Sequence, residues 1–377
     1  MLLAWLAAIG ISLSPSGYLK ELWQYSHSAL DDRPYYLNTG RARLTLDGTA
    51  WTYLKGHVDY DHTLVAGSYF RTPEYRLLGL NEPDNFLMMY QTIRRTPTSV
   101  WRQSLYRGWL GMETEKTVLR FGRQRIAWGT GKIWNPTDIL NPYHPTTVER
   151  DERAGVDVLY LRRAAGDLTQ FEAAYAPEVN WAKTALLARG KLNWKGFDFS
   201  LMGGKAAAST GSWITGGDFA GNLGQGSLHG EWSYTDLRTQ RPFWKGLLGY
   251  DYTFPSDAPL QAVLKDAATT IEYLHSGAGT TDVFRYNPTD LLTGRQVTLG
   301  KDYVGATYSK DLHSLLKLDW SILANLDDLS HFFGPSLQFN ALPNLYLSAG
   351  WQRFGGGTAT EFGRAPNVSY LQAQYYF

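Results

Sequence analysis

The chain has 377 residues, and its 36 Lys and Arg residues nearly balance 35 Asp and Glu residues, which gives a net charge of +1. This balance argues against a nucleic-acid-binding protein, and an aromatic content of 14% argues against a disordered chain. The absence of cysteine excludes thiol catalysis, disulfides and cysteine-ligated metals. We therefore expect an ordered protein with no cofactor, no metal and no nucleic-acid partner.

The N-terminal residues 1–13 form a short apolar run. A bilayer-spanning helix needs about 20 residues, so this run is too short to cross a membrane, but it has the length of a signal-peptide core. No Lys or Arg precedes it and no Ala-x-Ala site follows it. We expect a signal peptide over 1–16, with a buried N-terminal helix as the alternative. We expect residues 17–39 to form a short periplasmic helix or segment, or a plug.

From residue 40 to residue 377, apolar and polar residues alternate in segment after segment. Leu228, Gly230 and Trp232, for example, alternate with His229 and Glu231. This period of two is typical of half-buried β-strands. The pattern predicts about 16 antiparallel strands (range about 14 to 18) in an all-β protein. Their expected starts are near residues 40, 53, 99, 117, 154, 168, 184, 197, 226, 243, 269, 302, 314, 329, 344 and 367.

The same alternation fits a soluble sheet with its apolar face inward or a membrane barrel with its apolar face outward. The segments run to about 9–12 residues, which suits a tilted membrane crossing better than a soluble strand of about 5–6 residues. Trp and Tyr stand near segment ends, as at Trp194, Tyr234 and Trp351. These features favour a transmembrane antiparallel up-and-down β-barrel. A barrel of this size has a lumen too wide for its own side chains to fill.

The connections between the predicted strands alternate in length. Short turns at 164–167, 195–196 and 340–344 are expected on the periplasmic side. Longer connections at 65–98, 127–153, 206–226 and 278–301 are expected outside the cell or folded into the lumen.

The last strand ends at the terminal aromatic Phe377, which shares one face with Leu371, Ala373 and Tyr375. This strand resembles the C-terminal signature of Gram-negative outer-membrane β-barrels. The resemblance implies that the protein lies in the bacterial outer membrane, contacts outer-membrane lipids, and is recognised through this strand by the barrel assembly machinery.

A second resemblance covers residues 119–162. The segment follows the form G-R-Q-x-I-x-W-G-x-G-x-x-W-N-P-T-D-x-x-N-P and then E-R-x-E-R-x-G-V-D. It is similar to a segment of porin-like outer-membrane proteins of unassigned substrate. The resemblance implies location and architecture and names no solute.

Residues 127–153 are rich in Pro, Asn, Gly and Trp and do not alternate. Such residues form fixed turns, so we expect an ordered loop that folds inward between the fourth and fifth predicted strands. It ends in the five charges 149–153. In one interpretation these charges face others across a constriction and sort solutes by charge and size. In the other, the tryptophans and Asn-Pro turns attach the loop to the wall and the charges form a structural network.

The candidate site residues follow from this loop and from the polar strand faces. The expected constriction and lumen residues are Arg120, Gln124, Asp138, Glu149, Arg150, Asp151, Glu152, Arg153, Glu172, Arg189 and Lys191. The expected loop anchors are Trp128, Trp134, Asn135, Pro136 and Asn141. Both charge signs interleave on the polar faces, so no ion preference is expected.

Several functions are compatible with a barrel of this kind. The first is a porin-like channel for passive diffusion of small hydrophilic solutes, without enzymatic chemistry. The second is a barrel for hydrophobic or lipid cargo that works with a periplasmic partner protein. A barrel protease or lipase is a third, because His57, Asp59 and Asp61 share one face and an Asp/His pair can activate water or bind a metal. A structural barrel plugged by its own loops is a fourth.

Overall fold

A computed structural model describes residues 10–80, 85–142, 144–149, 155–209, 211–288, 291 and 296–377. Its strands form one antiparallel sheet. The strands are β1 (Ile11–His27), β2 (Pro34–Ala50), β3 (Leu54–Gly67), β4 (Tyr90–Thr96), β5 (Ser99–Glu113), β6 (Thr117–Gln124), β7 (Val156–Ala164), β8 (Gln170–Ala176), β9 (Ala185–Trp194), β10 (Phe197–Lys205), β11 (Trp213–Leu223), β12 (Gly226–Asp236), β13 (Phe243–Thr253), β14 (Ala268–Ser276), β15 (Asp302–His313), β16 (Leu316–Asn325), β17 (His331–Leu342), β18 (Leu345–Gly355) and β19 (Val368–Tyr376). Short helices are η1 (Ser68–Arg71), α2 (Pro73–Leu78), η2 (Trp181–Lys183), α3 (Gln261–Leu264) and η3 (Val283–Arg285).

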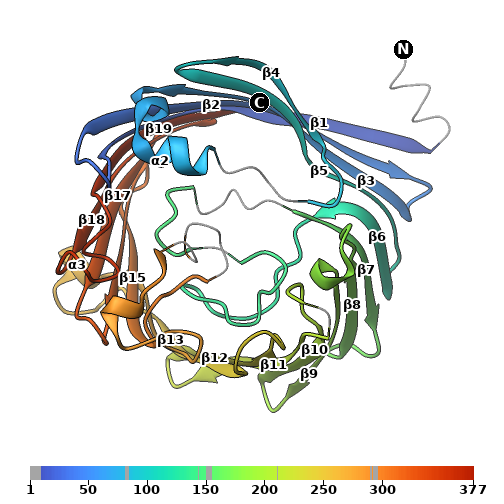
Figure 1. The fold of residues 1–377 in the computed structure, drawn as a ribbon. Coiled ribbons are helices and arrows are strands. Elements are labelled where there is room, and N and C mark those ends of the chain that lie inside the picture. Colours follow the sequence, from blue (N-terminus) through green and yellow to red (C-terminus); the bar gives the residue numbers. More distant parts are fainter. Residues whose placement is uncertain are drawn as a thin grey trace.

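The sheet closes on itself because β1 pairs with β19 on one side and with β2 on the other. Eighteen strands make the barrel wall in chain order, and β4 lies outside it (Figure 1). β4 pairs with the first part of β5, whose later residues pair with β6. The closure is completed at the C-terminus, where the backbone groups of Gly17 and Phe377 exchange two hydrogen bonds of 3.0 Å.

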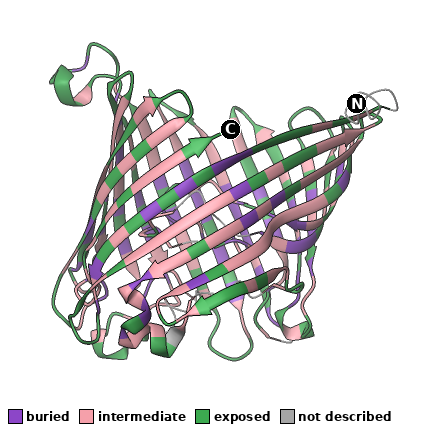
Figure 2. Ribbon diagram, turned by 90° about the horizontal axis from the view of Figure 1, so that it is seen from above, coloured by how far each residue is buried: buried purple, intermediate pink, exposed green. Residues whose placement is uncertain are grey.

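Exposure alternates along the strands, and many large apolar side chains face outward. On β10, Leu201 is 67% exposed whereas its neighbour Met202 is 4% exposed. Figure 2 shows this alternation as bands of exposed and buried residues along the wall. An apolar outer surface around a polar interior is the arrangement of a membrane-spanning barrel. Among the described residues, the helices are all too short or too polar to cross a membrane.

The predicted strand positions agree with sixteen of the barrel strands, and the fold class is confirmed. Two barrel strands, β1 and β11, were not predicted. The expectation that 17–39 forms a periplasmic segment or plug is wrong, because these residues belong to β1, the β1–β2 connection and β2. The expected connection over 206–226 is wrong for the same reason, since it contains β11. Both strands are rich in Gly, Ser or Pro, which weakens the alternating pattern.

The structure describes only part of the expected signal peptide over 1–16. Residues 1–9 of the expected signal peptide lie outside the described residues, and residues 11–16 lie in β1. The signal peptide therefore stays a prediction.

The connections at the two ends of the barrel differ in length, as expected. The end that carries the start of β1 and the C-terminus has tight turns at 51–53, 114–116, 195–196, 224–225 and 343–344. The β13–β14 connection, which contains α3, is the long exception there. The opposite end carries the long connections 68–98, 125–155 and 277–301. We call these the turn end and the loop end.

Candidate functional site

The β6–β7 connection enters the barrel interior with its described residues 125–142 and 144–149 (Figure 1). It starts at the loop end of β6 and touches inward side chains of β8, β12, β14, β18, β1 and β2 before β7 begins. We call it the luminal loop. The expectation of an ordered, inward-folded loop therefore agrees with the structure.

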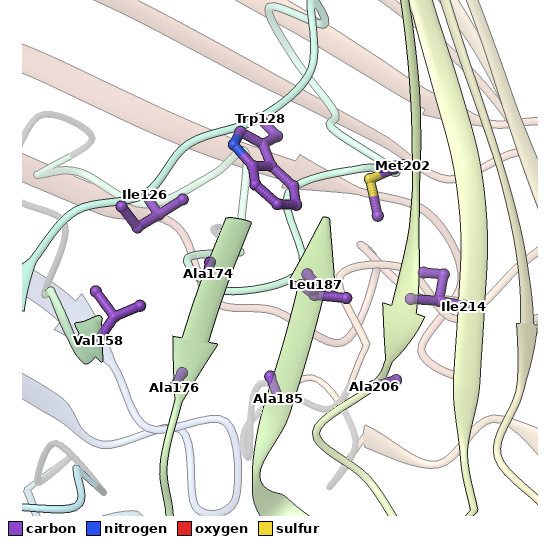
Figure 3. Packing of buried hydrophobic residues seen from close by; sticks show 10 residues of the cluster. All are labelled: Ile126, Trp128, Val158, Ala174, Ala176, Ala185, Leu187, Met202, Ala206 and Ile214. Carbon is purple, nitrogen blue, oxygen red and sulfur yellow. The ribbon is translucent and has the colours of Figure 1, made fainter. Parts of the chain in front are cut away.

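The first anchor of the luminal loop is Trp128. Its indole Nε1 donates a 2.8 Å hydrogen bond to Oε2 of Glu172 on β8. The indole is 3% exposed and packs with Ile126 against inward apolar side chains of the wall. Figure 3 shows Trp128 above Ala174 and Leu187 and beside Met202. Inward apolar residues on β7–β11 therefore pack against the loop and do not line an open channel.

The second anchor is the carboxylate of Glu231 on β12, which is 3% exposed. Its Oε1 accepts from the backbone N–H groups of Thr130 and Gly131, both at 2.6 Å. Its Oε2 accepts from the N–H of Thr137 at 3.0 Å and from the Thr137 hydroxyl at 2.9 Å. Gly129 enables this turn with φ 103°, a conformation that other residues rarely adopt. The loop thus supplies a buried carboxylate with four donors, which are three backbone N–H groups and one hydroxyl.

The third anchor is Glu272 on β14, which is fully buried. It accepts from the backbone N–H groups of Lys132 at 2.5 Å and of Ile133 and Trp134 at 3.1 Å each. His229 Nε2 lies 3.0 Å from its Oε1. Leaving a buried acceptor without its hydrogen bonds is costly, so these two glutamates hold the middle of the loop.

The fourth anchor is apolar. Ile133 and Trp134 are 4% and 2% exposed and join a buried cluster with Tyr303 and Leu323. Gly305 on β15 makes this contact possible, because a Cβ there would lie 2.8 Å from both Ile133 Cδ1 and Trp134 Cη2. The expected anchoring roles of Trp128 and Trp134 therefore have a clear geometric basis.

The loop then crosses to the opposite wall. Gln352 Nε2 on β18 donates to the carbonyl of Thr146 at 2.7 Å. Glu149 forms ion pairs with Lys20 on β1 at 2.6 Å and with Arg41 on β2 at 3.3 Å. Here a loop carboxylate meets basic side chains of the wall, which is the arrangement that the constriction hypothesis requires. The remaining charges of the expected run, 150–153, lie outside the described residues.

The wall next to Glu149 is rich in cations. Arg43 pairs with Asp61 at 2.6 Å and lies 4.0 Å from the centre of the Tyr106 ring. Arg41 also lies 3.7 Å from Asp61. Because β1 and β2 are neighbours in the wall, Lys20, Arg41 and Arg43 gather on one side of the lumen.

Beside this constriction lies a cavity of about 610 Å³. Charged lining residues include Lys20, Lys132 and Glu149, and Lys317 and Asp319 lie on its β16 side. Its remaining wall is mostly uncharged and polar. That part includes Gln338, Gln352, Gln372, Gln374, Ser336, Ser348, Thr307, Tyr18 and Tyr370.

The structure does not bring all predicted lumen residues to the constriction. Arg120 pairs with Glu113 near the 114–116 turn, and Lys191 pairs with Asp198 near the 195–196 turn, so both lie toward the turn end. Arg189 pairs with Asp218 at 2.8 Å and lies 3.5 Å from Glu172 under the first anchor. Alternation along a strand gives the face of a residue but not its neighbours across the lumen.

The other predicted residues support the loop from within. Asn141 Oδ1 accepts from the N–H of Ile126 at 2.8 Å, and Asp138 Oδ1 accepts from the N–H of Asn141 at 3.1 Å. Asn135 Oδ1 accepts from the Thr137 hydroxyl at 3.4 Å. Pro136 and Gln124 are buried beside them. These residues fix the shape of the loop and its exit from β6.

Sequence reasoning missed Glu272 and Lys20. Glu272 lies inward on β14, between Ile271 and Tyr273 that face outward with 59% and 44% exposure. A carboxylate at an inward position between two outward apolar residues is a signal that the sequence does contain, whereas its position opposite the loop is not. Lys20 was missed because β1 was not predicted.

The fold separates Asp61 from the proposed hydrolytic cluster of His57, Asp59 and Asp61. His57 lies between Asp47 at 2.7 Å and Asp59 at 3.1 Å, near the 51–53 turn. Asp61 instead pairs with Arg43. No group of three or more metal-binding side chains is found in the described part of the chain.

No protein-family model and no curated protein matches this chain. Solved structures do match its fold. OccK8 (OprE) of Pseudomonas aeruginosa has a TM-score of 0.58 at 10% identity, over 97% of this chain and 98% of that chain. OccK5 (OpdH) of the same organism has a TM-score of 0.57 at 12% identity, over 96% and 97%. This chain has the fold of a porin-like outer-membrane β-barrel. The outer membrane protein OprD of P. aeruginosa is also similar, with a TM-score of 0.54 at 12% identity, over 97% and 93%.

Proposed function

We propose that the protein is a bacterial outer-membrane channel that lets small hydrophilic solutes diffuse passively, filtered by the luminal loop. The observation that carries this proposal is the loop itself. A segment anchored to the wall at Glu172, Glu231 and Glu272 narrows a lumen that is otherwise too wide to select. Its far side places Glu149 against Lys20 and Arg41. Selection by size and charge needs only this geometry and no reaction.

The electrostatics of the constriction refine the expected selectivity. Lys20, Arg41 and Arg43 face Glu149 and Asp61 across a short distance. Three cations against two anions give a small positive excess, so a weak preference for anions is expected. Balanced total charge had suggested no preference, but the fold gathers the cations on one wall.

A channel for hydrophobic cargo has less support. The apolar loop residues that suggested it, Trp128, Ile133 and Trp134, are 3%, 4% and 2% exposed. They are packed against the wall and do not line the cavity.

The barrel assembly machinery is the partner that we propose for the β19 strand, where Leu371 and Tyr375 face outward with 58% and 45% exposure. A periplasmic partner would meet the turn end.

The test is single-channel recording from purified protein in planar bilayers, combined with liposome swelling. Steady ohmic steps and swelling that falls with increasing solute size are expected. Absence of both steps and swelling from correctly folded protein would reject the channel. A variant that deletes residues 130–137 should give larger steps, and equal conductance would reject the loop as the filter.

A further inference from the structure

The outer face of β1, β2, β3 and β5 differs from the rest of the apolar exterior. Elsewhere many outward positions are large and apolar, for example Leu119, Phe121 and Leu201, which are 39%, 67% and 67% exposed. On β1, the charged residue Glu21 occupies an outward position between Leu19 and Trp23, which are 52% and 46% exposed. Its neighbours Lys20 and Leu22 face inward, at 4% and 2%.

The register places Glu21 within the apolar band. On the turn-end side of Glu21 lies Leu19, which pairs across to the aromatic Tyr375 on β19. On the loop-end side, Trp23 and Tyr25 follow Glu21 along β1. Outward aromatic residues mark the two membrane interfaces of such barrels. Glu21, which pairs with Ala373, therefore lies between the two aromatic levels. A carboxylate at this depth is costly when it faces acyl chains.

Glu21 also lacks compensation from its own chain. In the described residues it has no hydrogen-bond or ion-pair partner. Its carboxylate lies over Gly40 of β2, where an added Cβ would be 2.6 Å from Oε1. The pairing residue of Leu19 on β2 is the small Ala42. Small residues on a membrane-facing surface allow a second protein surface to approach closely.

Polar side chains continue across the neighbouring strands. His62 on β3 pairs with Ala42 and, on its other side, with Gln103 of β5. Tyr60 Oη donates to Gln103 Oε1 at 2.7 Å, and Gln103 Nε2 donates to Gln91 Oε1 of β4 at 2.7 Å. Figure 2 views the barrel from the side that carries β1, β2 and β4 in Figure 1. We call this surface, formed by Glu21, Gly40, Ala42, Tyr60, His62 and Gln103, the outer polar patch.

We propose that the outer polar patch is the contact surface for a second copy of this chain within the membrane. The patch carries an acceptor, Glu21, and a donor, His62, two strands apart, which corresponds to about 10 Å. In a pair related by a two-fold axis, Glu21 of each copy meets His62 of the other, so the surface is complementary to itself. Lipid tails offer no donor to Glu21. A second copy removes both the unpaired carboxylate and the polar exterior from lipid.

The natural absence of cysteine allows a direct test. Ala42→Cys places one thiol in the patch, and the control Leu201→Cys places one on a different, apolar part of the exterior. Membranes that contain each variant are treated with a short bis-maleimide. A product of twice the chain mass is expected from Ala42→Cys and not from Leu201→Cys. Equal yields from both variants, monomer only, or a product of another mass would overturn the proposal; the last would indicate a different partner protein.

A second pair of variants tests the proposed contact in the Ala42→Cys background. Either Glu21→His or His62→Glu alone should lower the cross-linked fraction, by about fivefold for a contact of ordinary strength in a membrane. The two changes together should restore it, because they exchange acceptor and donor. The heat-dependent mobility shift of the folded barrel serves as the folding control. Unchanged yield in the single variants, or no recovery in the double variant, would reject this contact.

Discussion

The two halves of the lumen use their inward side chains in opposite ways. On β7–β14, the inward side chains that contact the luminal loop include apolar ones, such as Leu187 and Met202, and carboxylates that accept loop N–H groups, such as Glu231 and Glu272. On β16–β19 and β1–β2, the inward side chains that line the cavity include amides, hydroxyls and charged groups. One half of the wall holds the luminal loop and the other half is left to solutes. The same alternating strands therefore serve as a support on one side and as a selective surface on the other.

The largest expected effect comes from removing the polar supports of the covered half. The double variant Glu231→Ala and Glu272→Ala leaves seven hydrogen bonds to the loop unmade. Each hydrogen bond contributes about 0.5–1.5 kcal/mol, so the loop should lose roughly 4–10 kcal/mol of anchoring. Bilayer recordings should show larger and noisier steps. Glu113→Gln, at the turn end, is the matched control, and wild-type steps in the double variant would contradict the anchoring.

The apolar support should have the next largest effect. Trp134→Ala empties the buried space against Gly305 and Tyr303. Truncating a buried aromatic side chain costs about 3–5 kcal/mol. Denaturant unfolding in detergent should show this loss, whereas Trp194→Ala, at an outward position that is 61% exposed, should cost much less. Similar losses in the two variants would show that Trp134 is not a specific anchor.

The loop end of the open half should respond to pH through Glu361 in the β18–β19 connection. Burial raises the pKa of this carboxyl group to about 7, although the Tyr303 hydroxyl and the Leu299 and Gly300 N–H groups lower it. Its folded-state pKa lies above its ordinary value of 4.5, so the stabilisation is full below about pH 4.5 and declines as the pH rises to about 7. The decline is up to about 3 kcal/mol. The protection of the amides of residues 299 and 300, measured relative to their intrinsic exchange rates at each pH, should fall over this range, and Glu361→Gln should flatten the response. An unaltered profile in the variant would exclude Glu361 as its source.

The smallest expected effect concerns ion selectivity at the boundary between the two halves. Glu149→Gln removes the loop charge that faces Lys20 and Arg41. Two unit charges about 4 Å apart in water interact with an energy of about 1 kcal/mol, so the preference for anions over cations should increase by up to about fivefold. Reversal potentials in a salt gradient measure this change. Lys191→Gln, near the turn end, should shift them less, and a larger shift there would move the filter away from Glu149.

Most of the wall could be predicted because its chemistry is local. Residues that alternate every second position must face lipid and water in turn, and the pattern at 226–236 or 316–325 states this directly. β1 and β11 escaped prediction because Pro15, Ser16 and Gly17, or the glycines of 213–223, carry too little hydrophobic contrast. Each is recognisable as a strand only from the backbone partners on both of its sides.

By itself, the sequence determined a membrane barrel and an ordered loop, since alternation and turn-forming residues act over a few neighbouring positions. Only the tertiary structure decided which wall the loop contacts. The carboxylates that hold it, Glu231 and Glu272, lie about a hundred or more residues further along the chain, and Lys20 lies over a hundred residues before Glu149. Barrel closure sets such pairs by strand register and curvature. A pattern of local hydrophobicity carries no information on either.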